Sequence, residues 1–260
     1  MRMLERLGES AGPPLIGTWI KIPALETVEL LAHAGYDFVV VDMEHSPMTL
    51  EAAYRTTTVA HGLGMRVLVR VPDRGGSHIQ RVLDMGVDGI LVPHVSSAEQ
   101  AAEAVGSMLF PPRGTRGLGT TSRAGTWGLY STADYLRRGD EETLRIPQLE
   151  DLSALENAEA ILDTPGLNAV FLGTGDLTLS SGLTPGDPLL ARLTGELLRA
   201  AAARGVPCGT AVRDAPAAAR AAEQGFSYVM VSNDAHIFGD AAARLCRQAR
   251  SQTHRPEPRS

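Results

Sequence analysis

The stretch AGYDFVVVD (34–42) decides the fold, because its pattern returns three more times along the chain. In each copy a glycine, one further residue and a turn-forming residue precede an apolar run. The other copies are MGVDGILVP (85–93), PGLNAVFLG (165–173) and QGFSYVMVS (224–232). A helical segment precedes every glycine, so each copy predicts the end of a helix followed by a buried parallel strand.

Further strand candidates alternate with these copies, namely LIGTWIKI (15–22), RVLVRVP (66–72), RIPQLE (145–150) and VPCGTAV (206–212). Amphipathic or alanine-rich segments separate the strands. Eight strands that alternate with helices predict an α/β protein, a (β/α)8 barrel that forms a single domain over residues 1–250. An open doubly wound sheet is the alternative. The polar, proline-containing end of the chain, 251–260, is typical of a flexible tail.

Composition excludes several classes of function. Of 260 residues, 43% are hydrophobic and 21% are charged, which is ordinary for a soluble globular protein, and the net charge of −6 argues against nucleic acid as the main partner. The two cysteines, Cys208 and Cys246, form no CxxC pair, so neither a disulfide framework nor a thiolate zinc site is indicated. No apolar run approaches membrane-spanning length. We therefore expect a cytoplasmic protein without a membrane partner.

The barrel hypothesis places functional groups at the carboxyl ends of the strands, where the loops of such a barrel build the site. Polar residues do follow the predicted strands. They are Asp42, Glu44, His45, Arg70, His94, Gln148, Glu150, Asp176, Asn233 and Asp234.

Glu150 and Asp176 are a candidate metal pair. They follow neighbouring strands, which lie about 5 Å apart in a sheet, so both carboxylates could reach one cation. Oxygen ligands favour Mg²⁺ or Mn²⁺ over zinc. The alternative is that both residues are helix N-caps or surface charges, and spacing alone leaves the two interpretations open.

Arg70 is predicted to face the inside of the barrel, because the alternation in RVLVRVP places it on the same side as Leu68. A buried guanidinium needs an anionic partner. A bound carboxylate or enolate would serve, and so would a salt bridge to Asp42 or Asp84. Both roles stay open at this point.

His45 is the predicted general base, since imidazole titrates near neutral pH. Asp42 stands three residues earlier and would orient the imidazole if the chain turns after the strand. For His94 a supporting or packing role is favoured over catalysis. The stretch GTGD (173–176) offers successive backbone N–H groups that could hold a carboxylate beside Asp176.

The sequence also resembles a known family, and several motifs in order carry the resemblance. These are GTWIKIPALETVELLAHAGYDFVVVDMEHSPM (17–48), RVP (70–72), LDMGVDGILVPHV (83–95), FPPRGTRGLG (110–119), QLED (148–151) and FLGTGDLTLSSG (171–182). Together they resemble the HpcH/HpaI family of metal-dependent class II pyruvate aldolases, which includes 4-hydroxy-2-oxoheptanedioate and 2-keto-3-deoxy-sugar-acid aldolases. The resemblance implies a TIM barrel of the phosphoenolpyruvate/pyruvate-binding type. It also implies a homo-oligomer, a hexamer or a trimer, whose last helix is exchanged between neighbours.

Carried over residue by residue, the resemblance implies that Glu150 and Asp176 bind a divalent ion, Mg²⁺ or Mn²⁺ with Co²⁺ as a further option. It implies His45 as the base with Asp42 as its partner, and Arg70 as the group that binds pyruvate and stabilises its enolate. Glu44 is then expected to hold a water molecule on the metal.

The remaining roles concern the substrate. Asp84 corresponds to a family aspartate near the subunit interface and the aldehyde end of the site. Gln148 is expected to line the pocket, and the amides of Thr174 and Gly175 to hold the pyruvate carboxylate. Thr174 stands where the family more often has proline, and His94 where it more often has an apolar residue, so substrate preference is open.

The predicted activity is aldol cleavage or formation of 4-hydroxy-2-oxo acids from pyruvate and an aldehyde that the sequence does not identify. Lys21 is the only lysine in the chain, and its place in the first predicted strand does not suggest a Schiff base. Two alternatives remain: a citrate lyase-like enzyme acting on a CoA thioester, and a non-catalytic barrel that binds a metal and a 2-oxo acid.

Overall fold

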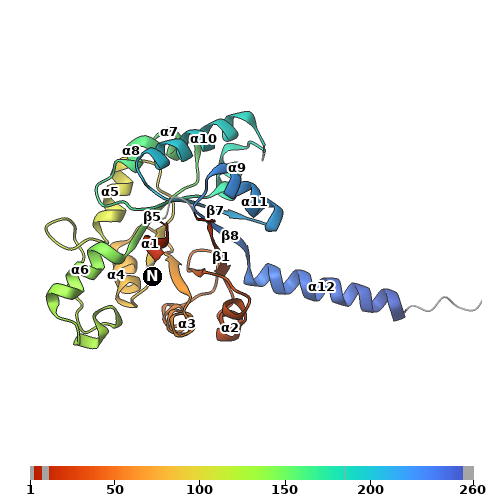
Figure 1. Cartoon of the computed structure of the whole chain (residues 1–260), viewed down its shortest axis with the longest axis horizontal. Helices are drawn as coiled ribbons and strands as arrows, with labels where there is room; N and C mark the ends of the chain where they lie inside the picture. Colours follow the sequence, from red (N-terminus) through yellow and green to blue (C-terminus); the bar gives the residue numbers. More distant parts are fainter. Residues whose placement is uncertain (1–2, 8–11, 185, 254–260) are drawn as a thin grey trace, which may run out of the picture.

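The computed structural model describes residues 3–7, 12–184 and 186–253. Over these residues, eight parallel strands close into a barrel in sequence order, each strand paired with the next and the last with the first (Figure 1). The strands are β1 (Leu15–Ile20), β2 (Phe38–Asp42), β3 (Arg66–Arg70), β4 (Gly89–Val92), β5 (Leu144–Leu149), β6 (Val170–Leu172), β7 (Cys208–Val212) and β8 (Tyr228–Asn233). The predicted (β/α)8 barrel is confirmed, and the open sheet is excluded.

Helices surround the barrel. They are α1 (Met3–Leu7), α2 (Leu25–His33), α3 (Leu50–Gly62), α4 (Gly76–Asp84), α5 (Ala98–Gly106), a 3-10 helix η1 (Arg123–Gly128), α6 (Thr132–Glu142), α7 (Leu152–Glu156), α8 (Ala158–Leu162), α9 (Thr174–Ser181), α10 (Pro188–Ala203), α11 (Ala215–Gln224) and α12 (Asp234–Thr253). The glycines of the four repeated stretches, Gly35, Gly86, Gly166 and Gly225, all have positive φ. Only glycine adopts this conformation without strain, which explains why it precedes these strands.

The barrel has two hydrophobic layers. The interior combines aliphatic side chains with the rings of Trp19, Phe38, Phe171 and Tyr228, and the outer layer lies between the strands and the helices. Glycine makes room for these rings, because a Cβ at Gly17 would collide with the ring of Phe38. The interior also receives alternate residues of β3, as the sequence pattern predicts.

Two aspartates fasten the amino-terminal rim of the barrel. Asp37 accepts the N–H of Ile16 at 2.9 Å and pairs with Arg6. Asp88 accepts the N–H of Val67 at 2.8 Å. The same carboxylate contacts His61 Nε2 at 2.8 Å and Arg66 Nη1 at 3.2 Å. Each aspartate precedes one strand and bonds to another, so it ties adjacent strands together.

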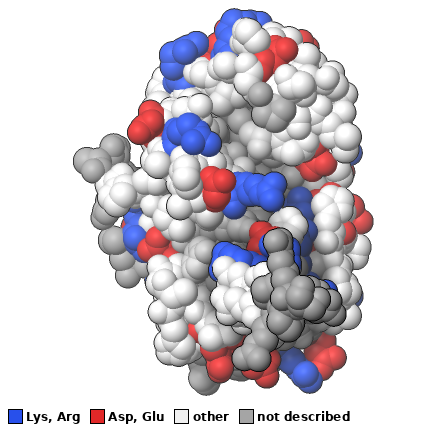
Figure 2. Space-filling model, turned by 90° about the vertical axis from the view of Figure 1, so that its right-hand side faces the viewer, with Lys and Arg blue, Asp and Glu red and all other residues white. Residues whose placement is uncertain are grey.

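The last helix, α12, projects away from the barrel (Figure 1). Only Asp234 at its start is buried, and this carboxylate accepts the N–H groups of Lys21 and Ile22. Figure 2 shows the face from which α12 projects, with basic and acidic side chains scattered among neutral surface. Residues 251–253 of the expected tail belong to α12, and 254–260 lie outside the described residues. Within the described part of the chain, no helix combines the length and apolar character needed to cross a membrane.

Candidate active site

Asp42 is the centre of the polar cluster at the carboxyl-terminal rim. It ends β2, is fully buried and lies opposite Arg70 in the register of β2 and β3. Arg70 donates to it twice, from Nε at 3.0 Å and from Nη2 at 2.8 Å. Lys21 Nζ also donates to this carboxylate. The salt bridge between Arg70 and Asp42, one of the two roles left open for Arg70, is therefore present.

This environment sets the protonation of Asp42. Burial alone raises the pKa of its carboxyl group, but the hydrogen bonds and positive charges of Arg70 and Lys21 outweigh burial and hold the pKa well below its usual range. Asp42 is thus an anion that fixes the position of two cations.

His45 lies at the mouth of the barrel with its side chain 57% exposed. The chain does turn after β2, but the turn brings the backbone N–H of His45, not its ring, to Asp42, at 3.2 Å. The ring Nε2 lies 3.7 Å from Glu44 Oε2. The structure therefore differs from the expected pairing: Asp42 positions His45 through the main chain, because Arg70 and Lys21 take its oxygens.

Arg70 faces the barrel interior, as predicted. Its guanidinium lies 4.5 Å from the centre of the Trp19 ring, and its Nη1 lies 3.0 Å from Glu44 Oε2. The guanidinium thus contacts two carboxylates, those of Asp42 and Glu44, and the face of the Trp19 ring. These contacts hold the guanidinium in place, with its Nη1 beside Glu44.

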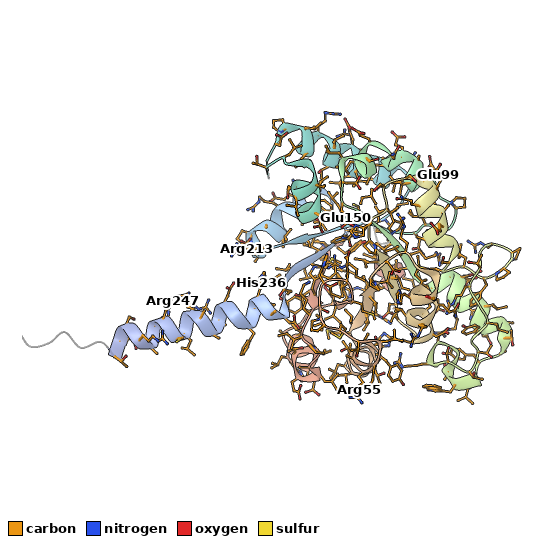
Figure 3. The ribbon with its side chains drawn as sticks, turned by 180° about the vertical axis from the view of Figure 1, so that it is seen from behind. Arg55, Glu99, Glu150, Arg213, His236 and Arg247 are labelled. Atoms are coloured by element: carbon orange, nitrogen blue, oxygen red, sulfur yellow. The ribbon has the colours of Figure 1, made fainter. Side chains whose placement is uncertain are left out.

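Glu150 follows β5 directly and is buried, with its side chain 5% exposed. Figure 3 labels it among crowded side chains near the strands, whereas Arg247 lies on α12, away from the barrel. His94 donates its backbone N–H to Glu150 Oε1, and Gln148 Nε2 donates to Oε2. A Cβ at Gly173 would lie 3.3 Å from Glu150 Oε2. That oxygen therefore faces the residue that caps α9.

Thr174, Gly175 and Asp176 form the first turn of α9, directly after Gly173. Thr174 and Gly175 are exposed, and Asp176 is half-buried. The N–H groups of a first helical turn have no acceptor within the helix, and the helix dipole favours an anion there. The structure thus places the expected carboxylate seat and Asp176 in the turn that directly follows Gly173, the residue that Glu150 Oε2 faces.

His94 links two of these carboxylates. Its ring Nε2 lies 2.9 Å from Glu44 Oε1 and its Nδ1 lies 2.8 Å from Glu150 Oε1. Burial raises the pKa of Glu44, and the charge of Glu150 acts in the same direction, while Arg70, His45 and His94 oppose the shift. Sequence reasoning gave His94 only a supporting or packing role and did not connect it to these two residues.

Two buried acceptors in the cluster have no hydrogen-bond donor among the described residues. They are Glu44 Oε2 and Gln148 Oε1. Arg70 Nη1 is close to the first of them but does not meet it in hydrogen-bonding geometry. Buried acceptors are normally satisfied, so both atoms indicate a ligand or water that donates to them. In the described part of the chain, no group of three or more His, Cys, Asp or Glu side chains is arranged to hold a metal ion.

Asp84 is the candidate residue that the structure does not bring to this cluster within one chain. It ends α4, which leads from the carboxyl-terminal rim at β3 back to the start of β4. There it contacts Gln80, Tyr135 and Arg116. Lys21, in contrast, was not expected in the site but belongs to the cluster. It lies one residue beyond β1, and its Nζ contacts Asp42 and the carbonyl oxygen of His45, a placement that its position in the predicted strand did not reveal.

A family model for HpcH/HpaI aldolase/citrate lyase matches residues 15–241. The chain belongs to the HpcH/HpaI family. The resemblance found in the sequence motifs is therefore confirmed.

Individual HpcH/HpaI relatives match over most of their length. The 4-hydroxy-2-oxovalerate aldolase of Novosphingobium aromaticivorans is 33% identical over 93% of this chain and 92% of its own. The 2-keto-3-deoxy-L-rhamnonate aldolase of Klebsiella pneumoniae is 31% identical over 96% and 94%. The crystal structure of an HpcH/HpaI aldolase from Desulfitobacterium hafniense covers both chains completely, with 29% identity and a TM-score of 0.88. These likenesses support an enzyme of the aldolase class.

Proposed function

We propose that this member of the HpcH/HpaI family is a divalent-metal-dependent pyruvate aldolase that forms or cleaves the C3–C4 bond of 4-hydroxy-2-oxo acids. The observation that carries the proposal is the buried Glu150 carboxylate. It is held by His94 and Gln148 and faces the first turn of α9, where Asp176 and free helix N–H groups lie. Relatives named as aldolases support the same reaction class.

The donor set fits a hard divalent cation. Glu150 and Asp176 would hold Mg²⁺ or Mn²⁺, and Co²⁺ is compatible with the same oxygen ligands. Glu44 Oε2 and Gln148 Oε1 would accept hydrogen bonds from water on the ion, which accounts for their missing donors. When bound, the ion supplies Lewis acidity at the keto oxygen of a 2-oxo acid.

Side chains and backbone groups of this chain would bind the substrate, stabilise the developing charge and transfer the proton. The N–H groups of Thr174 and Gly175 bind the carboxylate of pyruvate. Arg70 donates to the oxygen on which negative charge develops, and its bonds to Asp42 hold it in place for that purpose. His45, exposed at the mouth, takes a proton from the methyl group of pyruvate in the synthetic direction, or from the 4-hydroxyl group in the cleavage direction.

Assembly is a further part of the proposal. On α12 three large apolar side chains, Ile237, Phe238 and Leu245, are 40%, 71% and 68% exposed. A helix that projects in this way would bury these residues against a second copy of the chain, so we expect a homo-oligomer, a hexamer or a trimer, that exchanges α12. Light scattering coupled to gel filtration checks the mass of the assembly, and a monomer would contradict this part. We expect the enzyme in the cytoplasm.

The test follows the methyl protons of pyruvate in D₂O by NMR, with purified protein, with and without Mg²⁺ or Mn²⁺, and then with a panel of aldehydes. We expect metal-dependent exchange and aldol products. Glu150→Ala should abolish exchange and leave the thermal melt intact, while Glu156→Ala, an exposed glutamate on α7, serves as the matched control and should retain it.

Other outcomes overturn the proposal. Metal-independent exchange, or full exchange in Glu150→Ala, would remove the metal site from the mechanism. Binding of Mn²⁺ and pyruvate without exchange would indicate a non-catalytic barrel. Cleavage of a CoA thioester without aldol activity would indicate a citrate lyase-like enzyme.

A further inference from the structure

His94 has an unusual backbone conformation at the edge of the site. It follows β4 by two residues and has a φ of 57°, in the left-handed region that residues other than glycine rarely adopt. Two contacts hold this backbone: its carbonyl oxygen accepts from Arg74 Nη1 at 2.7 Å, and its N–H donates to Glu150 Oε1 at 2.6 Å. Backbone strain of this kind persists where the surroundings fix it, and functional sites are the common place for it.

The left-handed turn brings two groups of one residue to a single oxygen. The backbone N–H and the ring Nδ1 of His94 both meet Glu150 Oε1, the latter at 2.8 Å. The other oxygen, Oε2, is left facing Gly173 and the first turn of α9. His94 therefore anchors one oxygen of the Glu150 carboxylate by two contacts, while the other oxygen accepts from Gln148 Nε2 and faces Gly173.

The far side of the ring reaches the second carboxylate. Nε2 lies 2.9 Å from Glu44 Oε1, and the side chain of Glu44 is only 7% exposed. The imidazole thus stands between two buried carboxylates that would otherwise repel each other. The ring is itself 64% exposed, so it lies on the solvent side of these two buried carboxylates.

We propose that His94 is a positioning residue for the metal site, which acts through Glu150 and Glu44 and does not ligate the ion. The inference rests on the proposed function, because it assumes that Glu150 binds a divalent ion. Its consequence is specific: loss of the ring weakens metal binding and leaves the chemistry of the loaded enzyme nearly unchanged. Partners that orient metal ligands are typically worth about 10–100-fold in metal affinity.

Mn²⁺ titration followed by the EPR signal of the free ion tests this directly on the full-length protein. His94→Asn removes the ring but keeps a residue that tolerates the left-handed backbone. We expect its Kd for Mn²⁺ to rise about tenfold or more. His94→Gln, whose longer amide reaches one carboxylate, should recover part of the affinity. His78→Ala, a half-exposed histidine paired with Asp73 outside the site, is the matched control and should bind as the wild type does.

A second readout separates positioning from catalysis. At saturating Mn²⁺ the pyruvate exchange rate of His94→Asn should stay within about twofold of the wild type, while the Mn²⁺ concentration for half-maximal rate rises with Kd. Unchanged Mn²⁺ affinity in both His94 variants would overturn the inference and leave the proposed function standing. A histidine nitrogen coupling in the pulsed EPR spectrum of bound Mn²⁺ that disappears in His94→Asn would show direct ligation and also overturn it. If the wild type binds no Mn²⁺, the proposed function fails as well.

Discussion

The two rims of the barrel use carboxylates in opposite ways. At the amino-terminal rim, Asp37 and Asp88 accept strand N–H groups and pair with basic side chains, so their negative charge is balanced locally. At the carboxyl-terminal rim, Arg70 and His94 connect Asp42, Glu44 and Glu150, and one oxygen of Glu44 has no hydrogen-bond donor in the described structure. The first arrangement fastens strands together. The second leaves negative charge and acceptors for a ligand.

A single strand therefore has one end at the rim that stabilises the barrel and the other end at the rim that carries the proposed active site. β3 carries Arg66 at one end and Arg70 at the other, and both pair with aspartates. Arg70 also faces Trp19 and Glu44, inside the cluster that we propose to be the active site, whereas Arg66 lies at the rim that holds the barrel closed. Two arginines on one strand therefore offer matched substitutions.

Arg70→Lys should have a large effect on the reaction, the largest among the substitutions that compare the two rims. Lysine keeps the charge but cannot donate twice to Asp42 while it also donates to substrate. We expect metal-dependent exchange of pyruvate protons to fall about 100-fold, the typical loss of one preorganised donor. Arg66→Lys should exchange at close to the wild-type rate. An equal fall of the exchange rate in the two variants would contradict the proposal that only the carboxyl-terminal rim takes part in the reaction.

Asp88→Asn should change stability instead of activity. The substitution removes the charge that pairs with His61 and Arg66 and weakens the bond to the N–H of Val67. We expect a loss of about 1–3 kcal/mol in the free energy of unfolding, measured with urea. Asp134→Asn, an exposed carboxylate on α6, should change this free energy by about 0.5 kcal/mol or less. A stability loss no larger than that of the control would show that Asp88 does not fasten the rim.

The dependence of the free energy of unfolding on pH in the acid range should differ between the wild type and Asp88→Asn, and this is a smaller effect than the loss of stability itself. Burial alone raises the pKa of Asp88, but the hydrogen bond and charge of His61, the N–H of Val67 and Arg66 outweigh it and lower the pKa, as the cations around Asp42 do there. A carboxyl group whose pKa is lowered in the folded protein stabilises the fold at pH values above its unfolded pKa of about 4. This stabilisation is lost as the pH falls below about 4. Urea unfolding between pH 3 and 6 should therefore show stability falling below about pH 4, less steeply in Asp88→Asn. An unchanged slope would contradict the role of Asp88.

Much of this structure follows from local sequence. The glycine before each repeated strand needs a positive φ, and the alternation in RVLVRVP turns Arg70 inward, so the strands and the direction of Arg70 could be predicted. Asp42, Glu150 and Asp176 could be placed at one rim because parallel strands share a direction. These predictions depend only on periodicity and topology.

Other features depend on side-chain geometry that no local pattern encodes. The bridge from His94 to Glu44 and Glu150 requires a left-handed backbone two residues past β4. β1 ends at Ile20, two residues before the end of the predicted strand 15–22, and Lys21 just beyond it contacts Asp42. Asp84 lies apart from the cluster, and its expected role at the aldehyde end would need a second chain, which the sequence of one chain does not position.

The most direct test of the contrast between the rims compares Glu150→Ala and Asp88→Asn in one assay, Mn²⁺-dependent exchange of pyruvate methyl protons in D₂O, with a thermal melt of each variant. Our account predicts that Glu150→Ala loses exchange and keeps its melting temperature, whereas Asp88→Asn melts earlier and keeps exchange while folded. Exchange that survives in Glu150→Ala, or that disappears in folded Asp88→Asn, would contradict it.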